Sequence, residues 1–391
     1  MSVAGARSFG LAVVRWFRAN GDAAWPWRGP FPRDPYRVWI SEVMLQQTTL
    51  KAAAPRFERW MRRFPDVAAL ARADPAAVVR EWEGLGYYAR ARNLHRAARV
   101  IMTQQGGRIP DDERALCALP GIGPYTAAAI LSLAFGRPVP VLDANVRRVV
   151  RRVLGMAEWN RAAEKELLAF LRAAMPRRDA SAPGAFNEGL MELGQKLCRP
   201  ADPLCGCCPL ARRCAARAAG IQNQIPPRRS ASPIRRQTTL LALVDERRRL
   251  LIVRRAAGLL KDLWVLPGLP VRSGRPPGAD PSPAAEVSSS AAAGGETGDP
   301  AAWIRARAAC IAVRLGALPA RTHSYTRFSE RLRPEVWLVR RPRSRPMPGA
   351  RWVSLTALGR YPVPSVYRRI LNDLADFLEN QSRRPGLFDQ G

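Results

Sequence analysis

Two carboxylate side chains, Glu42 and Asp143, are candidates for chemistry, the first as a proton donor and the second as an anion. Asp34-Pro35 marks the start of a helix, since Asp is a favoured N-cap and Pro fits the first helical position. A carboxyl group partly buried among apolar residues has a raised pKa and can donate a proton near neutral pH. An ordinary solvated glutamate is the alternative that this pattern leaves open. Helical spacing places Glu42 at the edge of an apolar stripe formed by Tyr36, Trp39, Ile40, Val43 and Met44.

A glycine-rich turn at residues 119–126, Leu-Pro-Gly-Ile-Gly-Pro-Tyr-Thr, predicts a grip on a phosphate backbone. Gly121 and Gly123 would point backbone N–H groups outward, at the start of a helix whose dipole favours anions. The flanking segments favour helix, so residues 112–135 read as a helix-hairpin-helix that holds DNA. Asp143 follows and adds a carboxylate, which turns a DNA-binding hypothesis into an enzymatic one. It is also placed to cap the next helix, and the two roles are compatible.

Four cysteines, Cys198, Cys205, Cys208 and Cys214, are spaced as a compact ligand set, with Cys207 as an extra neighbour. Of the 7 cysteines in the chain, most lie in this short segment, which suits a metal site in a reducing compartment better than disulfides. Four thiolates fit an iron–sulfur cluster or a zinc ion, and the spacing alone leaves both open.

The charge of the whole chain points to a polyanionic partner. The formal net charge is +31 and the isoelectric point is about 11.4, with 63 basic and 32 acidic residues. Nucleic acid is the simplest partner for such an excess. The sequence has no apolar run long enough to span a membrane and no secretion signal at its start, so we expect a cytoplasmic, nucleoid-associated protein.

Composition divides the chain into two domains. Residues 1–225 are expected to be almost wholly helical, with residues 198–214 as the cysteine loop, followed by a basic, proline-marked linker at 226–237. Residues 238–378 are expected to form a smaller α+β domain, with helices over 303–315 and 365–379. Residues 271–300 read as a disordered insertion and 379–391 as a flexible tail. The expected fold is therefore a multidomain one, mostly α-helical with a smaller α+β domain.

Six motifs in order give the chain a resemblance to the MutY family of adenine DNA glycosylases, within the helix-hairpin-helix glycosylase superfamily. The resemblance covers nearly the whole chain and implies a two-lobed helical domain that flips a base out of the duplex. The motifs are Trp25-Pro26-Trp27-Arg28, residues 41–48, residues 84–94, residues 119–126, residues 142–146 and Phe186-Asn187-Glu188.

The resemblance also implies roles for individual residues. Glu42 would protonate N7 of adenine, and Asp143 would face the sugar cation that develops as the glycosidic bond breaks. Four residues would surround the adenine: Arg28, Tyr125, Asn145 and Glu188. Three would contact the duplex beside the orphaned 8-oxoguanine: Gln46, Gln47 and Tyr87. The four cysteines would hold a [4Fe–4S] cluster.

Tyr125 limits the chemistry further. Related endonuclease III enzymes carry a lysine at this hairpin position, and it attacks the sugar and nicks the strand. A phenol forms no Schiff base, so the resemblance implies a monofunctional glycosylase that leaves an abasic site.

The second domain resembles the MutT-like (Nudix) domain that the family uses to recognise 8-oxoguanine, without the Nudix pyrophosphatase box. Asp262 stands where the family has glycine, and Tyr325-Thr326-Arg327 aligns with the family's Phe-Ser-His recognition loop. Arginine can donate to guanine acceptors, so lesion specificity either persists through a changed contact or relaxes toward A:G. The end of the chain, residues 386–390, reads as an unstructured tail, with a replication-clamp motif as the alternative.

The expected function is removal of adenine from duplex DNA containing A:8-oxoG or A:G mispairs, by a monomer. An enzyme for thymine glycol or G:T mispairs is one alternative, and Glu42 argues against it because pyrimidine-specific relatives typically lack this acid. A catalytically silent iron–sulfur DNA-binding protein is the other, and the presence of both Glu42 and Asp143 argues against that.

Overall fold

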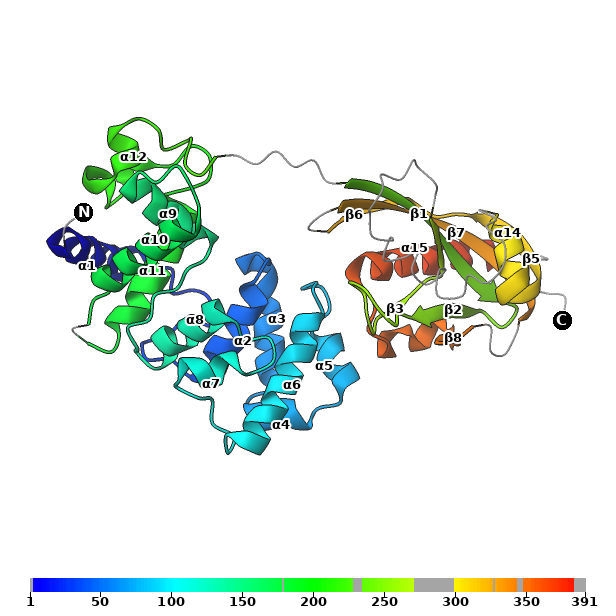
Figure 1. Cartoon of the computed structure of the whole chain (residues 1–391). Helices are drawn as coiled ribbons and strands as arrows, with labels where there is room; N and C mark the ends of the chain where they lie inside the picture. The colour runs from blue at the N-terminus through cyan, green and yellow to red at the C-terminus, as the bar shows by residue number, and fades with distance from the viewer. Residues whose placement is uncertain are drawn as a thin grey trace. The chain divides into compact units, whose positions relative to one another are not determined.

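The structure is a computed structural model that describes residues 3–177, 179–227, 234–270, 299–325, 328–342 and 347–382. The chain forms two compact units, one made of Met1–Ala73 with Arg92–Ser230 and the other of Asp74–Ala91 with Ala231–Gly391. Figure 1 labels their helices and strands. Within the described ranges, no helix combines the length and the apolar character that a membrane crossing requires.

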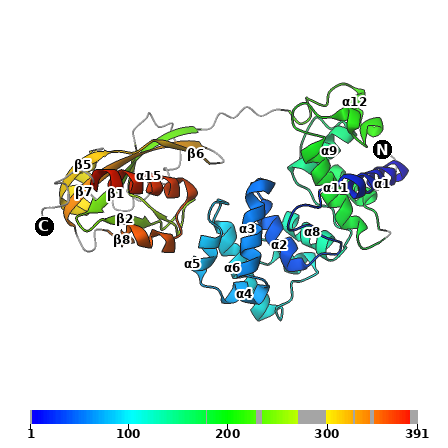
Figure 2. The same ribbon diagram turned by 180° about the vertical axis from the view of Figure 1, so that it is seen from behind.

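The first unit is helical, as the sequence predicts. One group of helices packs around α11, which contacts α1, α8 and α9 (Figure 2). A second group contains the contacting pairs α2 with α3, α2 with α8, and α7 with α8. Helix α6 begins just before the boundary between the units. The helices are α1 (Val3–Asn20), α2 (Pro35–Leu45), α3 (Leu50–Arg63), α4 (Val67–Arg72), α6 (Ala89–Gln104), α7 (Glu113–Cys117), α8 (Pro124–Ala134), α9 (Ala144–Leu154), α10 (Arg161–Ala174), α11 (Ala182–Lys196) and α12 (Ala215–Ala218).

Local sequence signals fix the ends of the helices that carry the candidate site. Asp34 caps α2 by accepting from the Arg37 backbone N–H at 2.8 Å, with Pro35 at the first helical position, as the sequence predicts. Helix α9 ends at Leu154 and is capped by Gly155, whose φ of 72° is the left-handed conformation that glycine adopts without steric cost. An apolar core that includes Phe9, Val149 and Phe186 joins α1, α9, α10 and α11 and holds them as one body.

The second unit contains an eight-stranded mixed sheet in its described part. The central strands β1 and β7 run parallel, paired from Ile234 with Phe328 to Asp245 with Val339, and the other pairs are antiparallel. Helix α15 contacts β6. The elements are α5 (Pro75–Glu81), β1 (Ile234–Asp245), β2 (Arg249–Arg254), β3 (Trp264–Val265), β4 (Gly268–Pro270), α14 (Pro300–Arg307), β5 (Ala309–Ala317), β6 (Arg321–Ser324), β7 (Phe328–Pro342), β8 (Ala350–Ser354) and α15 (Ser365–Ser382).

The helix expected over 303–315 is wrong in its second half. Helix α14 ends at Arg307, and residues 309–317 form strand β5, which pairs with β7. Ile311, Val313 and Leu315 alternate with smaller or charged residues, which is the period of a strand. The alanines around them favour helix locally, but the long partner strand β7 decides the conformation.

Several expected boundaries shift by a few residues. Strand β1 begins at Ile234, inside the range 226–237 expected as linker, because β7 offers a pairing partner from Phe328 onward. Helix α14 begins at Pro300, inside the range 271–300 expected as an insertion, and Asp299 caps it through the Ala301 and Ala302 backbone N–H groups. Helix α15 runs to Ser382, into the expected tail, and most of that tail, like residues 271–298, lies outside the described residues.

Residues 74–91 group with the second unit rather than with the helical one in which the sequence places them. In this unit Arg368 binds Glu83 through two bonds, with the Nε–Oε1 distance at 2.9 Å and the Nη2–Oε2 distance at 3.1 Å. The Arg80 guanidinium also donates to the carbonyl of Arg360 at 3.2 Å. These polar contacts join the segment to the C-terminal part of the second unit.

Candidate active site and cysteine pocket

Glu42 is buried more deeply than the sequence pattern indicates. Its residue exposure is 7%, and the Tyr125 hydroxyl donates to its Oε2 at 2.8 Å. Burial raises the pKa of Glu42 to about 7, the charges of Glu188 and Asp143 add to the effect, and the Tyr125 hydrogen bond and Arg28 oppose it. A glutamic acid in this position keeps its proton close to neutral pH and can give it to a bound group.

Asp143 caps helix α9, as its position in the sequence predicts. One carboxylate oxygen accepts from the Val146 backbone N–H at 2.6 Å, and the other accepts from the Asn145 side-chain amide at 2.9 Å. Burial raises the pKa of Asp143, and these hydrogen bonds offset part of that increase. The two bonds hold the carboxylate in one orientation, and its charge acts on Glu42.

Arg148, which the sequence reasoning missed, connects Asn145 to the cysteine loop. Its guanidinium donates to Asn145 Oδ1 at 2.9 Å, to the carbonyl of Gly194 at 2.9 Å and to the carbonyl of Cys198 at 2.8 Å. Gly194 allows the close approach of α11 to α9, since a Cβ there would lie 2.6 Å from the Cβ of Asn145. An arginine among valines on the buried face of α9 was the available signal.

Glu188 lies at the centre of a buried ion-pair network. Arg28 donates to its Oε2 at 2.8 Å and to Glu192 Oε2 at 3.3 Å, and Arg33 donates to both oxygens of Glu188 at 2.7 Å. Arg28 and Glu188 were predicted from the sequence, whereas Arg33 and Glu192 were not. Glu192 stands one helical turn after Glu188 on α11, which is the spacing of a shared face.

The hairpin between α7 and α8 has the conformation that its glycines suggest. Gly121 has a φ of 80°, and a Cβ there would lie 2.6 Å from the Cβ of Asn93. Gly123 precedes Pro124 as the N-cap of α8, and a Cβ on it would meet nothing within 4 Å. The open side of Gly123 leaves room for a ligand at the helix N-terminus.

The two glutamines that follow α2 differ in their contacts. The Gln46 side chain donates to Thr126 Oγ1 of α8 at 3.1 Å, so it joins the turn after α2 to the helix that follows the hairpin. Gln47 is exposed and has a φ of 56°, which a non-glycine residue rarely adopts.

The remaining predicted contact residues belong to the second unit. Tyr87 has a φ of 46°, and 41% of the residue is exposed. The ring of Tyr325 stacks on Phe328 with centroids 4.5 Å apart and meets His323 edge-on at 4.6 Å. Thr326 and Arg327 lie outside the described residues, as does the segment 386–390. The structure thus brings Glu42, Tyr125, Asp143, Asn145, Arg28 and Glu188 together in one unit and places Tyr87 and Tyr325 in the other.

Asp262 occupies a glycine-like position, as the departure from the family pattern suggests. Its φ of 65° is the left-handed conformation that glycine adopts without cost. Its carboxylate accepts from Arg254 at 3.2 Å, so an arginine balances the anionic charge that this substitution introduces.

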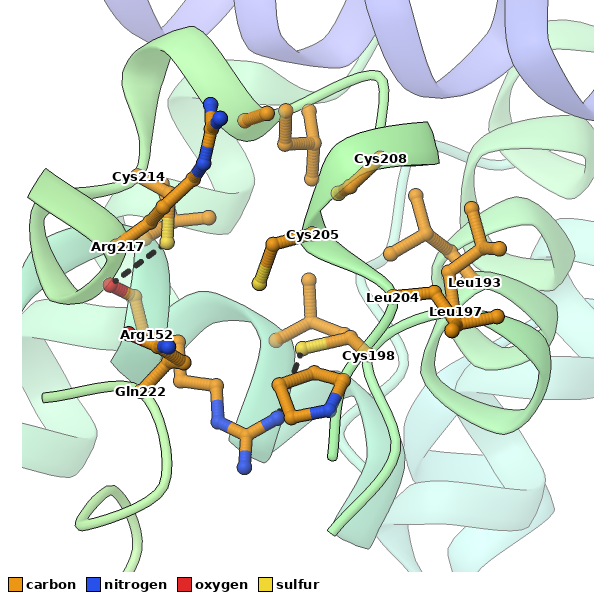
Figure 3. A pocket seen from close by; sticks show the side chains of 15 residues that line it. Arg152, Leu193, Leu197, Cys198, Leu204, Cys205, Cys208, Cys214, Arg217 and Gln222 are labelled. Carbon is orange, nitrogen blue, oxygen red and sulfur yellow. Dashed lines mark hydrogen bonds between the residues drawn. The ribbon is translucent and has the colours of Figure 1, made fainter. Parts of the chain in front are cut away.

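The four spaced cysteines line a single pocket. Figure 3 shows the sulfur atoms of Cys198, Cys205 and Cys214 around a common space, and Cys208 lines it as well. The space not filled by atoms is about 390 Å³ and includes open solvent. In the described part of the chain, no three His, Cys, Asp or Glu side chains lie close enough together to hold one metal ion. Cys198, Cys205, Cys208 and Cys214 are therefore the candidate ligands that share this pocket.

Arg152 of α9 closes one side of the cysteine pocket. It is 1% exposed and donates to Cys198 Sγ at 3.3 Å (Figure 3). It also donates to the carbonyls of Arg199, Pro200 and Ile225 at 2.7 to 3.0 Å. The thiol of Cys214 donates to the Arg152 carbonyl at 3.4 Å. A buried guanidinium bonded to a cysteine sulfur suits a site in which thiolates carry negative charge.

Comparisons with known proteins agree with this arrangement. Residues 40–173 match the HhH-GPD superfamily of base excision DNA repair proteins. An adenine DNA glycosylase of Mycobacterium tuberculosis is 41% identical over 220 residues, which cover 56% of this chain and 70% of that protein. An adenine DNA glycosylase of Buchnera aphidicola is 38% identical over 210 residues, 53% of this chain and 59% of that protein, so the match spans little more than half of that relative's length.

A solved structure supports the fold of the first unit. A thermostable thymine-DNA glycosylase is 27% identical, with a TM-score of 0.50 over 55% of this chain and 98% of that protein. Together with the helix-hairpin-helix and the paired carboxylates, these matches identify the chain's relatives. The chain belongs to the adenine DNA glycosylase family, within the helix-hairpin-helix superfamily of base excision DNA repair proteins.

Proposed function

We propose that this protein is a DNA glycosylase that removes adenine mispaired with 8-oxoguanine or guanine and leaves an abasic site. The observation that carries the proposal is the pair formed by Glu42, which holds a proton near neutral pH, and Asp143, whose carboxylate is fixed in orientation beside it. Cleavage of an N-glycosidic bond builds positive charge on the sugar and negative charge on the base, so an acid and an anion are the two groups it needs.

Each candidate site residue of the first unit has its own role in the proposed reaction. The hairpin at Gly121 and Gly123 binds the phosphate backbone, and the adenine leaves the stack to enter the pocket lined by Arg28, Tyr125, Asn145 and Glu188. Glu42 gives its proton to adenine N7 as the bond between C1′ and N9 breaks, and the bonding electron pair leaves with the base. Asp143 faces the developing sugar cation. Water then adds to C1′, and its proton returns to the carboxylate of Glu42.

The test is single-turnover base release from duplexes containing A:8-oxoG, A:G, G:T or thymine glycol. Adenine release from the first two is the expected result. Release only from G:T or thymine glycol would replace the proposal by a pyrimidine-specific one, and no release from any duplex would favour a DNA-binding protein without catalysis.

We propose that the second unit recognises the base opposite adenine through Tyr325 and the adjoining residues. The ratio of the release rates from A:8-oxoG and A:G duplexes measures the preference for 8-oxoguanine over guanine.

The hairpin residue Tyr125 predicts that the protein has no strand-nicking activity. Its hydroxyl is bonded to Glu42, and burial raises its pKa well above the usual value, so neither a free amine nor a ready nucleophile stands at this position. Borohydride treatment of the reaction on A:8-oxoG duplex is expected to trap no covalent protein–DNA adduct above the background without borohydride. An endonuclease III with its hairpin lysine is the positive control. Trapping as efficient as that control would contradict the assignment.

We further propose that Cys198, Cys205, Cys208 and Cys214 hold a [4Fe–4S] cluster. A zinc ion holds four sulfurs within about 4 Å of one another, as follows from its bond lengths and tetrahedral geometry. A four-iron cluster separates them more widely because iron and sulfide fill the space between, and the four cysteines line one common pocket. When bound, the cluster would supply a one-electron redox group and link the end of α11 to the loop that follows.

Replacing Cys208 by Ser is expected to lower the iron content and the thermal unfolding midpoint of the purified protein, because one of four anchors of the loop is lost. Cys207→Ser is the matched control, since Cys207 is exposed and is not among the residues lining the pocket, and it should leave both quantities unchanged. Iron analysis, visible absorption and calorimetry are the measurements. A colourless protein that contains stoichiometric zinc would overturn the cluster assignment.

A further inference from the structure

Arg33 lies outside every motif that suggested the function, yet it makes the closest contacts with Glu188. We infer that Arg33 is a positioning residue that fixes the Glu188 carboxylate, so that Glu188 in turn holds Arg28 in the base pocket. The inference rests on the proposed function, because Arg28 and Glu188 are placed in the pocket by that proposal. It assigns no contact between Arg33 and the substrate.

The contact between Arg33 and Glu188 is a paired, nearly solvent-free one. Both terminal nitrogens of Arg33 donate to the two oxygens of Glu188 at 2.7 Å, and the exposures of the two side chains are 8% and 6%. A planar guanidinium facing a carboxylate through two parallel bonds fixes the plane of the carboxylate as well as its distance. Arg33 therefore sets the orientation of Glu188.

Arg33 is itself held on three sides. Its Nε donates to the Gly29 carbonyl at 3.1 Å, its guanidinium carbon lies 4.1 Å from the centre of the Phe31 ring, and its backbone N–H donates to the Leu133 carbonyl at 3.0 Å. Phe31 in turn sits against Gly184 of α11, where a Cβ would lie 2.6 Å from the ring. Because Arg33 is restrained in this way, it can hold the Glu188 carboxylate in one position.

The loop that carries these residues lies along one face of α11. Gly184, Glu188 and Glu192 are spaced four residues apart on this face. Gly184 contacts Phe31, Glu188 binds both Arg33 and Arg28, and Glu192 binds Arg28. Gly184 leaves room for the ring, and the two acids bind the guanidinium groups. The match between the loop and this face explains why Arg33 reaches Glu188 across a long stretch of sequence.

The consequence of this arrangement appears at Arg28. One terminal nitrogen of Arg28 donates to Glu188 and the other to Glu192, while its buried Nε has no hydrogen-bond partner among the described residues. Arg28 also acts electrostatically on Glu42. A buried N–H without a partner is costly, and an acceptor nitrogen of a purine would remove that cost. Two acids thus hold Arg28 with one donor still available, and Arg33 holds the first of those acids.

A double-mutant cycle tests the inference. Single-turnover adenine release from A:8-oxoG duplex is measured for Arg33→Gln, Glu188→Gln and the double variant, together with the thermal unfolding midpoint and the dissociation constant for a duplex with a non-cleavable abasic analogue. Arg33→Gln is expected to slow release about 10²-fold, the scale of a lost buried charge-assisted pair. Because Arg33 acts through Glu188, the double variant should be no slower than Glu188→Gln, and the dissociation constants should stay within about threefold.

Three further variants separate positioning from general stability. Arg33→Lys keeps the charge without the planar fork and should recover only part of the rate. Gly184→Ala pushes Phe31 away from α11 and should slow release in the wild-type background but not in Glu188→Gln. Arg18→Gln, which breaks the exposed ion pair with Asp179, is the matched control and should leave the rate unchanged. Slowing by Arg33→Gln that multiplies with that of Glu188→Gln, or a loss of stability without a change in rate, would overturn the inference.

The cycle has a second readout that does not depend on catalysis. With 2-aminopurine in place of adenine, fluorescence reports how far the base leaves the stack, and the same variants give the same cycle. If the wild-type protein releases no adenine, the proposed function fails, and the fluorescence cycle still decides the role of Arg33. Non-additive flipping supports it, and independent effects of the two substitutions refute it.

Discussion

Glu42→Gln is expected to slow adenine release by about 10²- to 10⁴-fold, the range that a positioned general acid contributes. Glutamine keeps the size of the side chain and can still accept the hydrogen bond from Tyr125, but it has no proton to transfer to N7. The comparison therefore isolates proton transfer from packing. Binding to duplex DNA should change little, since Glu42 is buried and not part of the hairpin.

The rate of adenine release should depend on pH through this same group. The pKa of Glu42 is about 7, so the acid form predominates below that value and the rate is expected to fall as pH rises through it. A single-turnover profile from pH 5 to 9 measures this, and the limb near 7 should be absent from the residual activity of Glu42→Gln. Undiminished adenine release by the variant, or a profile that stays flat through this range in the wild type, would refute the role of the acid.

The raised pKa also has a stability consequence with a definite sign. A glutamate in the unfolded chain releases its proton near pH 4.5, whereas the folded protein keeps it until about pH 7. The folded state binds more protons between these values, so the free energy of unfolding falls as pH rises across the window, by about 3 kcal/mol at most. Glu42→Gln should remove this fall and be the more stable protein at pH 8, as expected for a group kept for chemistry.

Asp143→Ser is expected to slow adenine release by about 10²- to 10³-fold, with little loss of stability. Serine is also a good N-cap and can accept from the Val146 backbone N–H, but it carries no charge to face the sugar cation. Asp143→Ala removes the cap as well and should lower the free energy of unfolding by about 1 kcal/mol more. Single-turnover rates and denaturant unfolding of the two variants separate the two roles. If serine restores nearly full activity, Asp143 serves mainly as a cap.

Local signals in the sequence were sufficient to predict the parts of the site that neighbouring residues determine. The cap at Asp34, the cap at Asp143 and the glycine-dependent hairpin each depend on a few adjacent residues, and the structure confirms these local features. The spacing of Glu42 also indicated a partly apolar environment, although its full burial depends on helices that come later in the chain. The catalytic roles stay proposals until the variants are measured.

Contacts between distant segments could not be read from the sequence. Arg33 meets Glu188 because a loop lies along α11, and Arg148 meets Cys198 because α9 and α11 approach closely at Gly194. No periodicity or spacing records such encounters. The same limit explains strand β5, where local alanines favoured helix and the pairing with β7 decided otherwise.

Helix α11 carries Glu188 in its middle and leads directly into Cys198, so one rigid segment fixes the distance between the proposed base pocket and the cysteine pocket. Inserting or deleting a single residue between those positions would turn one end of the helix by about 100° relative to the other. Either Glu188 would leave Arg33 or Cys198 would leave its pocket. The number of residues in this stretch is therefore as tightly constrained as their identity.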